Sequence, residues 1–502
     1  MYRFEVKFVG NRVYWKSKSM KKGLIGALCV GLMTAVLAGP VLAQGYRIEA
    51  TLAGLRDTSC ILGHYNYSGQ QFIAKDTARA DATGRMVFEG RENLPGGLYL
   101  ILLPGQQKLV QVVYSGKETN FSMKTDTSNI VKSMVVKGSD ENRMFYEYQQ
   151  QLNQIMGEVE AVNAEKKLKS NNVSADLADK KIKDLQQKFT DFQQKFLKEH
   201  SASFTAKLLK ASMDPAIPPA PTLADGKKDS LWVFNYYKAH YWDNFDFSDE
   251  RMLRTPFVQP KLERYVKDLI VQVPDSLNKD ADALIKKAAT NKELRSRIIY
   301  YFTSEYENPK VVGTEEVFVH MAEKYYLSGE MDVSDDAKKR IGERVASMKP
   351  LLVNRVIPDI TLTSPTQQPV SIHSIKSDYT VLFFYSPTCG HCKEAAPKLK
   401  EFYDANKAKG VKVLAIATEH HPEEWQKFIK DYKLQDILNG YDYTDKVDFR
   451  TQYDVFSTPT IYVLDKNKKI IARRMPVEQL DDFFNFYLKN KAKEGTKSVS
   501  VN

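Results

Sequence analysis

Two cysteines three residues apart carry the clearest chemistry in the sequence, in the segment Cys389-Gly390-His391-Cys392. An apolar run over 379–385 predicts a buried strand before them, and the pattern over 394–407 predicts a helix after them. Cys389 is therefore expected at a helix N-terminus, where unpaired N–H groups and the helix dipole favour a thiolate. Cys392 follows on the same face of the first turn, within reach of a disulfide. Cys389 would attack the disulfide of a client protein, and Cys392 would resolve the mixed disulfide.

Three other uses of such a cysteine pair are weaker alternatives. A zinc site needs four ligands, yet this region has no second C-x-x-C, and only His420 and His421 stand near in sequence. Covalent haem attachment needs a histidine directly after the second cysteine, where Lys393 stands. A static structural disulfide is the third alternative. We therefore predict a redox-active Cys389–Cys392 disulfide that uses no metal and no other cofactor.

The chain around this site predicts a multidomain protein in three parts. Short alternating strands over 44–139, separated by closely spaced turns, indicate an antiparallel β-sandwich. Apolar residues at helical spacing over 140–351 indicate an all-α region that includes a long helical hairpin with its break at 171–174. Buried strands alternate with helices over 352–490, which predicts an α/β sheet with helices on both faces. The polar end, 491–502, is expected to be a disordered tail.

The third part, about 135 residues long, resembles the thioredoxin superfamily. The order strand, C-G-H-C and helix matches that family, and so does Pro397, five residues after the second cysteine. Thr458 and Pro459 stand just before an apolar strand and resemble the cis-proline loop. The segment 357–372 resembles the leading hairpin of the extracytoplasmic TlpA/ResA-like branch. The resemblance implies a thioredoxin-like fold and a cis Thr458–Pro459 bond, with the Thr458 backbone aimed at the client chain beside the cysteines.

Three positions depart from the usual pattern of that family. Thr388 stands where thioredoxins usually have a tryptophan, and Phe383 stands where they have a buried acid. The TlpA-like branch often has a glutamate where this chain has Ala395, while Glu394 is one place earlier. The base that deprotonates the second cysteine is therefore open between Glu394, Glu419 and a water molecule.

His391 is a candidate for tuning the cysteine pair. A histidine at this place resembles protein disulfide isomerase. A protonated imidazole beside Cys389 would stabilise its thiolate, and so the reduced form, which makes the disulfide a better oxidant. The alternative is an exposed histidine with no role.

Composition and charge restrict the remaining function classes. The chain has 502 residues, 43% of them hydrophobic and 27% charged, which excludes a wholly disordered, collagen-like or multi-span membrane protein. Of the net charge of +11, the first 43 residues supply +6. The rest has no dense basic patch with interleaved aromatic residues, so nucleic-acid binding is not predicted.

The first 43 residues have the pattern of a leader. Met20 and two lysines precede an uncharged stretch over 23–43, and Val41-Leu42-Ala43 fits a small-residue cleavage site. This pattern predicts a Sec signal peptide over 20–43, with 1–19 an upstream extension. An uncleaved membrane anchor is the alternative, since the uncharged stretch nearly spans a bilayer. Either outcome puts the bulk of the chain in the periplasm or cell envelope, with membrane contact only if the leader stays attached.

Cysteine usage agrees with an exported redox protein. With Cys29 in the leader, only Cys60, Cys389 and Cys392 remain, too few for a secreted disulfide framework. Cys60 lies between predicted strands and is expected to be a buried structural thiol. An intermolecular disulfide, or a redox exchange with the C-terminal pair, is the alternative.

These observations predict an extracytoplasmic thiol-disulfide oxidoreductase that reduces or isomerises disulfides of envelope proteins. Its expected partners are protein thiols and disulfides. The TlpA-like resemblance implies a reductase fed by a membrane-bound electron donor, with cytochrome c maturation as one role, whereas the histidine favours an oxidase or isomerase. The whole architecture also resembles envelope proteins that combine a β-sandwich, a helical insert and a TlpA-like thioredoxin. A binding or scaffold protein with an accessory thioredoxin-like module is the alternative function.

Overall fold

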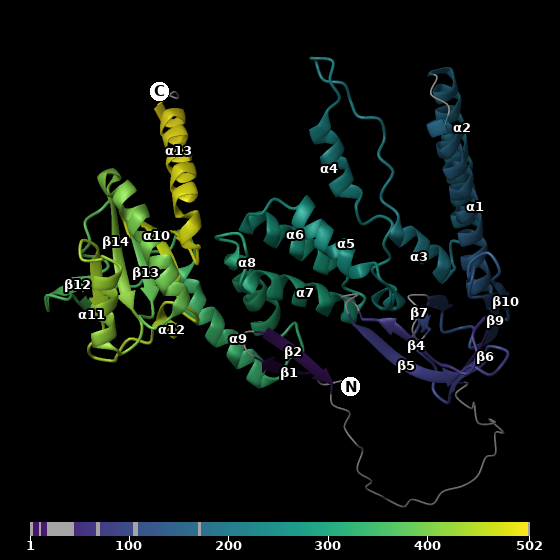
Figure 1. The fold of residues 1–502 in the computed structure, drawn as a ribbon, viewed down its shortest axis with the longest axis horizontal. Helices are drawn as coiled ribbons and strands as arrows, with labels where there is room; N and C mark the ends of the chain where they lie inside the picture. Colours follow the sequence, from purple (N-terminus) through teal and green to yellow (C-terminus); the bar gives the residue numbers. More distant parts are fainter. Residues whose placement is uncertain are drawn as a thin grey trace, which may run out of the picture. The chain divides into compact units, whose positions relative to one another are not determined.

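The fold is given by a computed structural model that describes residues 4–9, 12–17, 45–66, 71–103, 109–168 and 172–499 (Figure 1). The predicted signal peptide over 20–43, with its Cys29, lies outside these residues. Before it, strands β1 (Phe4–Val9) and β2 (Arg12–Ser17) pair antiparallel. Among the helices that the structure describes, none is both long enough and apolar enough to cross a membrane.

The strand-rich region after the leader contains two four-stranded sheets, with the orders β10-β9-β3-β6 and β5-β4-β7-β8. Strand β3 alternates between buried and partly buried residues, as expected for a strand with one face in a core. The strands are β3 (Tyr46–Ala53), β4 (Ser59–Tyr65), β5 (Phe72–Arg79), β6 (Arg85–Gly90), β7 (Gly97–Leu102), β8 (Leu109–Tyr114), β9 (Asn120–Asp126) and β10 (Val135–Lys137).

One strand pair in this region corrects the prediction of a wholly antiparallel arrangement. Strands β3 and β9 run parallel, whereas the other neighbours in the two sheets are antiparallel. The chain leaves this sheet for β7 and β8 of the other sheet before it returns at β9. A local hairpin therefore does not set the direction of β9.

The predicted helical hairpin is confirmed by α1 (Asp140–Leu168) and α2 (Asn172–Glu199), which lie side by side (Figure 1). Tyr148 of α1 packs against Phe189, Phe192 and Phe196 of α2, with ring centroids 5.3–5.9 Å apart. The aromatic stripe of α2 is thus a helix–helix contact. The helices that follow are α3 (Phe204–Ser212), α4 (Ser230–His240), α5 (Val258–Arg264), α6 (Pro274–Lys287), α7 (Lys292–Glu307), α8 (Glu315–Met321) and α9 (Asp335–Met348).

Short 3₁₀ or π segments extend or link several of these helices. Their bounds are η1 (Glu250–Arg254), η2 (Tyr265–Leu269), η3 (Ala322–Leu327), η4 (Lys349–Leu351), η5 (Lys407–Lys409) and η6 (Val477–Gln479).

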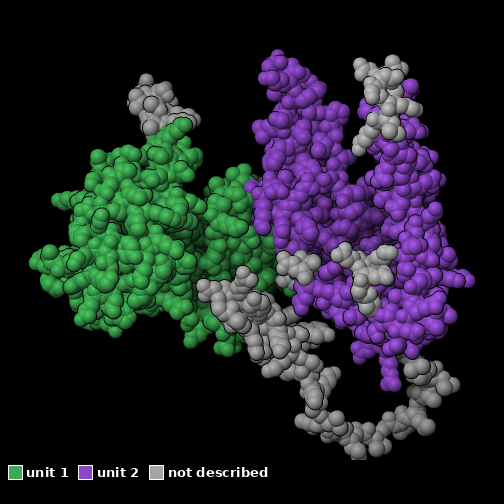
Figure 2. All heavy atoms as spheres, in the orientation of Figure 1, with its two compact units in different colours: residues 1–24, 271–283, 296–502 green, residues 25–270, 284–295 purple. Residues whose placement is uncertain are grey.

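The helical region does not form one body. The chain divides into two compact units, one with residues 1–24, 271–283 and 296–502 and the other with 25–270 and 284–295 (Figure 2). Most of α7 and all of α8 and α9 therefore belong with the C-terminal domain. Buried ion pairs join them to it, such as that of Arg344 with Asp454. The sequence predicted a single helical domain over 140–351, because pairings between residues so far apart in the chain leave no local pattern.

The C-terminal domain is built on a seven-stranded sheet in the order β12-β11-β15-β14-β13-β16-β17. Strand β13 is central, and all seven of its residues are buried, which explains the continuous apolar run. It pairs parallel with β14 and antiparallel with β16. The strands are β11 (Thr361–Thr363), β12 (Pro369–Ser371), β13 (Tyr379–Tyr385), β14 (Val411–Ala417), β15 (Leu438–Tyr441), β16 (Thr460–Asp465) and β17 (Ile470–Arg473).

Helices cover both faces of this sheet, as predicted. Phe402 of α10, Trp425 of α11 and Phe484 of α13 lie in the core cluster of one face, while Phe449 of α12 lies in that of the other. The helices are α10 (Gly390–Asn406), α11 (Pro422–Asp431), α12 (Phe449–Gln452) and α13 (Leu480–Val499). The last helix continues to Val499, where the sequence analysis expected a disordered tail from 491.

Candidate active site

Cys389 caps the N-terminus of α10, the place that the sequence predicted. Strand β13 ends at Tyr385, residues 386–388 form a loop, Cys389 is the N-cap residue, and α10 begins at Gly390. The Cys389 thiol is half-buried, and its Sγ lies 3.5 Å from the carbonyl oxygen of Thr458. Burial opposes ionisation of Cys389, but hydrogen bonds from the backbone of Cys392 and His391 outweigh it and lower its pKa.

Cys392 has the opposite environment. It is 0% exposed and belongs to the core cluster between the sheet and α10. Burial raises the pKa of its thiol to about 12. Both cysteines are free thiols in this structure. The accessible Cys389 can act as nucleophile, whereas Cys392 needs a proton acceptor before it can attack.

The loop before β16 brings Thr458 to the cysteines. Strand β16 pairs with β13 so that Thr460 lies opposite Phe384, which sets the preceding loop beside the start of α10. The Thr458–Pro459 bond is cis, as the resemblance implies. The Cys389 thiol donates to the Thr458 carbonyl oxygen. A residue 69 positions later in the chain thus contacts the first cysteine through its backbone.

The remaining predicted residues of the motif lie on α10. The His391 side chain is 86% exposed, and its Nδ1 lies 3.7 Å from Oε2 of Glu394, which is 77% exposed. The structure thus brings Glu394 to His391, on the surface, and away from the buried Cys392. Gly390 begins the helix, with open space where a Cβ would point. Pro397 lies inside α10.

Glu419, the other carboxylate left open by the sequence, is tied to the loop before Cys389. It accepts hydrogen bonds from the hydroxyl groups of Ser386 and Thr388, the latter at 3.0 Å. The Ser386 carbonyl accepts from the Cys389 N–H at 3.2 Å, and a hydrogen bond from the Ser386 backbone reaches Cys392. Ser386 therefore connects Glu419 with both cysteines. Sequence analysis missed it, although a hydroxyl residue just before a helix start is a typical loop signal.

Two buried aromatic rings lie at the end of β13, and one of them, Phe383, is at the position where thioredoxins have a buried acid. Phe383 and Tyr385 are both fully buried, with ring centroids 5.3 Å apart and nearly parallel. Burial, and then the charge of the nearby Cys392 thiolate, raise the pKa of Tyr385. Tyr385 is a second neighbour of Cys392 that sequence reasoning did not single out, because it lies inside an uninterrupted apolar run.

The other candidate residues lie apart from this pair. His420 forms an ion pair with Asp445 at 2.6 Å, and His421 stands just before α11. No group of three or more His, Cys, Asp and Glu side chains in the described segments is arranged to hold a metal ion. Cys60 on β4 is fully buried and is a free thiol, and burial raises its pKa. This agrees with the expectation of a buried thiol.

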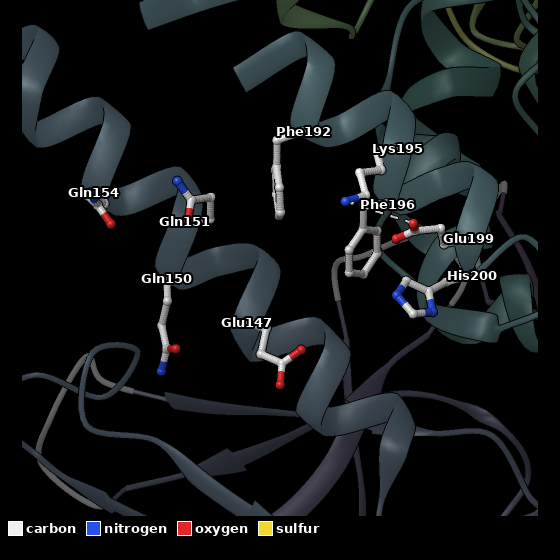
Figure 3. A pocket seen from close by; sticks show the side chains of 9 residues that line it. All are labelled: Glu147, Gln150, Gln151, Gln154, Phe192, Lys195, Phe196, Glu199 and His200. Carbon is white, nitrogen blue, oxygen red and sulfur yellow. Dashed lines mark ion pairs between the residues drawn. The ribbon is translucent and has the colours of Figure 1, made fainter. Parts of the chain in front are cut away.

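A cavity lies between α1 and α2, in the compact unit that does not contain the cysteine pair. Its volume is about 500 Å³. Figure 3 shows glutamines of α1 and two phenylalanines of α2 among the lining residues, and the ion pair of Lys195 with Glu199. None of the residues that the sequence predicted for the site lines it.

Comparison with protein families gives a match for each of the three predicted parts. Residues 353–473 match the AhpC/TSA family. Residues 46–145 and 194–350 match two domains of unknown function, DUF4369 and DUF5106. Of these three matches, the one that is not to a domain of unknown function covers the part that contains Cys389 and Cys392.

Curated relatives match the same part. A thiol-disulfide oxidoreductase ResA of Bacillus cereus is 22% identical over 145 residues, which is 28% of this chain and 80% of that protein. Sporulation thiol-disulfide oxidoreductase A of Bacillus subtilis (strain 168) is 27% identical over 116 residues, 22% of this chain and 67% of that protein.

Two solved structures are similar. One is a domain of a possible thiol-disulfide isomerase from Cytophaga hutchinsonii ATCC 33406, with 41% identity, 29% of this chain and 98% of that chain covered, and a TM-score of 0.28. The other is a thioredoxin-like protein from Bacteroides caccae ATCC 43185, with 20% identity, 54% and 98% covered, and a TM-score of 0.45.

Proposed function

Since residues 353–473 match the AhpC/TSA family and the curated relatives of this part are thiol-disulfide oxidoreductases, we propose that the chain reduces or isomerises disulfides of proteins in the cell envelope. The observation that carries the proposal is the position of Cys389, half-exposed at the start of α10 with a lowered pKa. The leader pattern over 20–43 supports a location in the periplasm or cell envelope.

The reaction proceeds by two thiol–disulfide exchanges. The Cys389 thiolate attacks one sulfur of the client disulfide, so that bond breaks, a mixed disulfide forms and the other client sulfur leaves as a thiolate. Cys392 then loses its proton and attacks Cys389 Sγ. The Cys389–Cys392 disulfide forms, and the second client thiolate leaves. Two electrons have passed to the client. A dithiol protein, expected to be membrane-bound, then reduces the Cys389–Cys392 disulfide by the reverse exchange and is itself oxidised to a disulfide.

Glu419 is the proton acceptor that this site offers to Cys392. Its carboxylate holds the side chain of Ser386, and the Ser386 backbone contacts the Cys392 sulfur. Glu419 is thus the carboxylate bound to the loop that contacts Cys392, whereas Glu394 faces His391 at the surface. A base is required because burial keeps Cys392 protonated at neutral pH.

His391 and the loop at Thr458 complete the site. A protonated His391 near the start of α10 stabilises the Cys389 thiolate and raises the reduction potential of the pair. The Thr458 backbone, which already contacts Cys389, receives the client segment next to its cysteine. Gly390 and Pro397 shape the helix start and its interior.

The first two parts of the chain are proposed to support this module. We infer three parts over 44–139, 140–351 and 352–490, the second of which is divided between the two compact units, with the two sheets of the first facing each other as a sandwich. The hydrogen bond of the Tyr46 hydroxyl on β3 with Asp76 on β5, at 2.8 Å, supports this, since these strands belong to different sheets.

Reduction of insulin by the mature chain, with dithiothreitol as the electron source, tests the proposal. Wild type should accelerate insulin precipitation, and Cys389→Ala should abolish the acceleration. Cys392→Ala should instead accumulate a mixed disulfide with the client that non-reducing electrophoresis detects. Cys60→Ala is the matched control and should behave as wild type. Full activity of Cys389→Ala would refute the proposed function.

A further inference from the structure

A pocket of about 250 Å³ adjoins the loop that contacts Cys389. The cis-proline loop supplies one wall, and the segment after α7 supplies another. Arg474, directly after β17, supplies the charge. The residues that matter here are Asn308, Pro309, Ser457, Pro459, Thr460 and Arg474. The helical region and the thioredoxin-like domain thus build this pocket together, within one compact unit.

Three arginines and three carboxylates form a cluster of ion pairs beside the pocket. The carboxylate of Asp454, which is fully buried, is shared by three guanidinium groups, those of Arg344, Arg473 and Arg474. Arg473 also has Glu315 at 3.6 Å, and Arg344 also has Glu307 at 3.5 Å. Among the ion pairs of the described residues, Arg474 has only its share of Asp454, at 2.8 Å. Arg474 therefore has the least compensated charge of the three.

Arg474 is also the one of these three that borders the pocket. Its side chain is 23% exposed, whereas that of Arg473 is fully buried. The Arg474 backbone has φ +52°, a left-handed conformation that costs energy for a residue other than glycine. Its guanidinium donates to Asn308 Oδ1 and to the Asp454 carbonyl. The helical region therefore holds this guanidinium at the pocket.

The mouth of the pocket adds an aromatic surface to this charge. Phe456, which lines the pocket, is 39% exposed. Arg344 and Arg450 lie over its ring at 5.1 and 4.8 Å from the centroid. A group that enters the pocket meets guanidinium and ring surfaces, and Asp454 is already occupied. A carboxylate on a short aliphatic stem fits such a surface, because guanidinium groups bind carboxylates through paired hydrogen bonds.

We propose that this pocket binds an acidic side chain, Asp or Glu, that flanks the reactive cysteine of the client. The inference rests on the proposed function. A client cysteine joined to Cys389 lies beside Thr458, and an extended segment advances ~3.3 Å per residue. A side chain one or two residues from that cysteine therefore reaches Ser457, Pro459 and Arg474. The helical region takes part in choosing the client through Asn308.

The test uses the full mature chain and three peptides, each joined to glutathione through its single cysteine. The peptides differ only in the flanking residue, which is Glu, Gln or Lys. The value of kcat/KM is measured for each at low and high salt. Wild type should prefer the Glu peptide over the Gln peptide by at least about fivefold, and salt should reduce the preference.

Variants at Arg474 separate charge from structure. Arg474→Gln should bring the ratio of Glu to Gln peptide below about twofold, whereas Arg474→Lys should keep most of it. Lys412→Gln removes an equal charge at the start of β14, at the opposite end of the central strands from the cysteines, and should leave the ratio unchanged. A glutathione titration should give the same reduction potential for wild type and Arg474→Gln, because the pocket acts on the client and not on the cysteines.

Each outcome has a defined meaning. Equal kcat/KM for Glu and Gln peptides in wild type overturns the pocket assignment and leaves the proposed function intact. An undiminished preference in a folded Arg474→Gln variant also overturns it. If Arg474→Gln fails to fold, the wild-type ratio, its salt dependence and Arg474→Lys decide. No reaction of wild type with any peptide would instead count against the proposed function.

Discussion

The Sγ atom of Cys389 lies 3.5 Å from the carbonyl oxygen of Thr458, a residue on a different loop that enters the sheet through β16. This contact joins the nucleophile to the backbone that a client must approach. It also means that two segments distant in sequence, the start of α10 and the loop before β16, make one site. The predictions below follow from the environment of that site and of the charges behind it.

The two active-site thiols should differ in their pH-dependent reactivity. Hydrogen bonds lower the pKa of Cys389, whereas burial raises that of Cys392 to about 12. Alkylation of the reduced protein by iodoacetamide at pH 7 should therefore label Cys389 alone, and its rate should fall as pH drops below that lowered pKa. Mass spectrometry of the labelled protein locates the modification. Cys60, buried with a raised pKa, is the internal control. Labelling of Cys392 before Cys389 would contradict the assignment of the nucleophile.

Replacing the exposed histidine should make the disulfide a weaker oxidant. We expect His391→Pro to lower the reduction potential by tens of millivolts, with about 30 mV for each tenfold change in the exchange equilibrium. The reason is the loss of an imidazole that, when protonated, stabilises the Cys389 thiolate. Equilibration with glutathione buffers measures the potential, and Glu394→Gln, which removes the counter-charge of His391, should shift it in the opposite direction. An unchanged or higher potential in His391→Pro would reject the tuning role.

The absolute potential of the wild type decides the direction of electron flow. A value near −270 mV, as in thioredoxin, identifies a reductase, whereas roughly −120 to −180 mV identifies an oxidase or isomerase. The same glutathione series provides this value.

Glu419 should control how fast the mixed disulfide is resolved. Removal of a general base typically costs about 10²–10⁴ in rate, so Glu419→Gln should prolong the mixed disulfide by about 10² or more. Rapid acid quenching during single-turnover reduction of a peptide disulfide follows this species. Glu394→Gln is the matched control, since its carboxylate is exposed and paired with His391, and its resolution rate should equal that of wild type. The reverse result, a slow Glu394→Gln and a normal Glu419→Gln, would transfer the base role to Glu394.

Loss of the buried carboxylate behind the cis-proline loop should destabilise the whole unit. Asp454→Asn leaves three guanidinium groups without their shared anion, and breaking a buried ion pair typically costs about 3–5 kcal/mol. Thermal or urea unfolding measures the change. Asp445→Asn is the control, because Asp445 is 77% exposed and pairs only with His420 among the described ion pairs, so its loss should cost below about 1 kcal/mol. Similar free energies of unfolding for the two variants would show that the buried cluster does not contribute to stability.

Local patterns were enough to predict the central elements of the site. The apolar run of β13 has one interpretation as a buried strand, and the cysteines fall where a helix must begin, so the position of Cys389 followed from spacing alone. The cis-proline loop was found from the resemblance, and the structure has the cis bond.

Contacts between residues far apart in the chain could not be predicted from the sequence. Nothing near Asp454 or Arg473 in the chain marks them as partners of Arg344 and Glu315, since each charge taken alone fits a solvated surface. The division of the helices between two units was missed for that reason. The parallel pair β3–β9 was missed because strand direction depends on connections, and Glu419 could not be preferred over Glu394 until its contact with Ser386 was known.

The complete burial of Arg473 has a mechanical consequence. Its guanidinium faces Asp454 on one side and, through Glu315 and the Leu351 carbonyl, the preceding helices on the other. If those helices moved away, the Arg473 guanidinium would remain buried without part of its partners. Separation of the helices from the redox module therefore costs considerable free energy. The helix that carries Glu315 and the thioredoxin-like domain therefore stay together as parts of one compact unit.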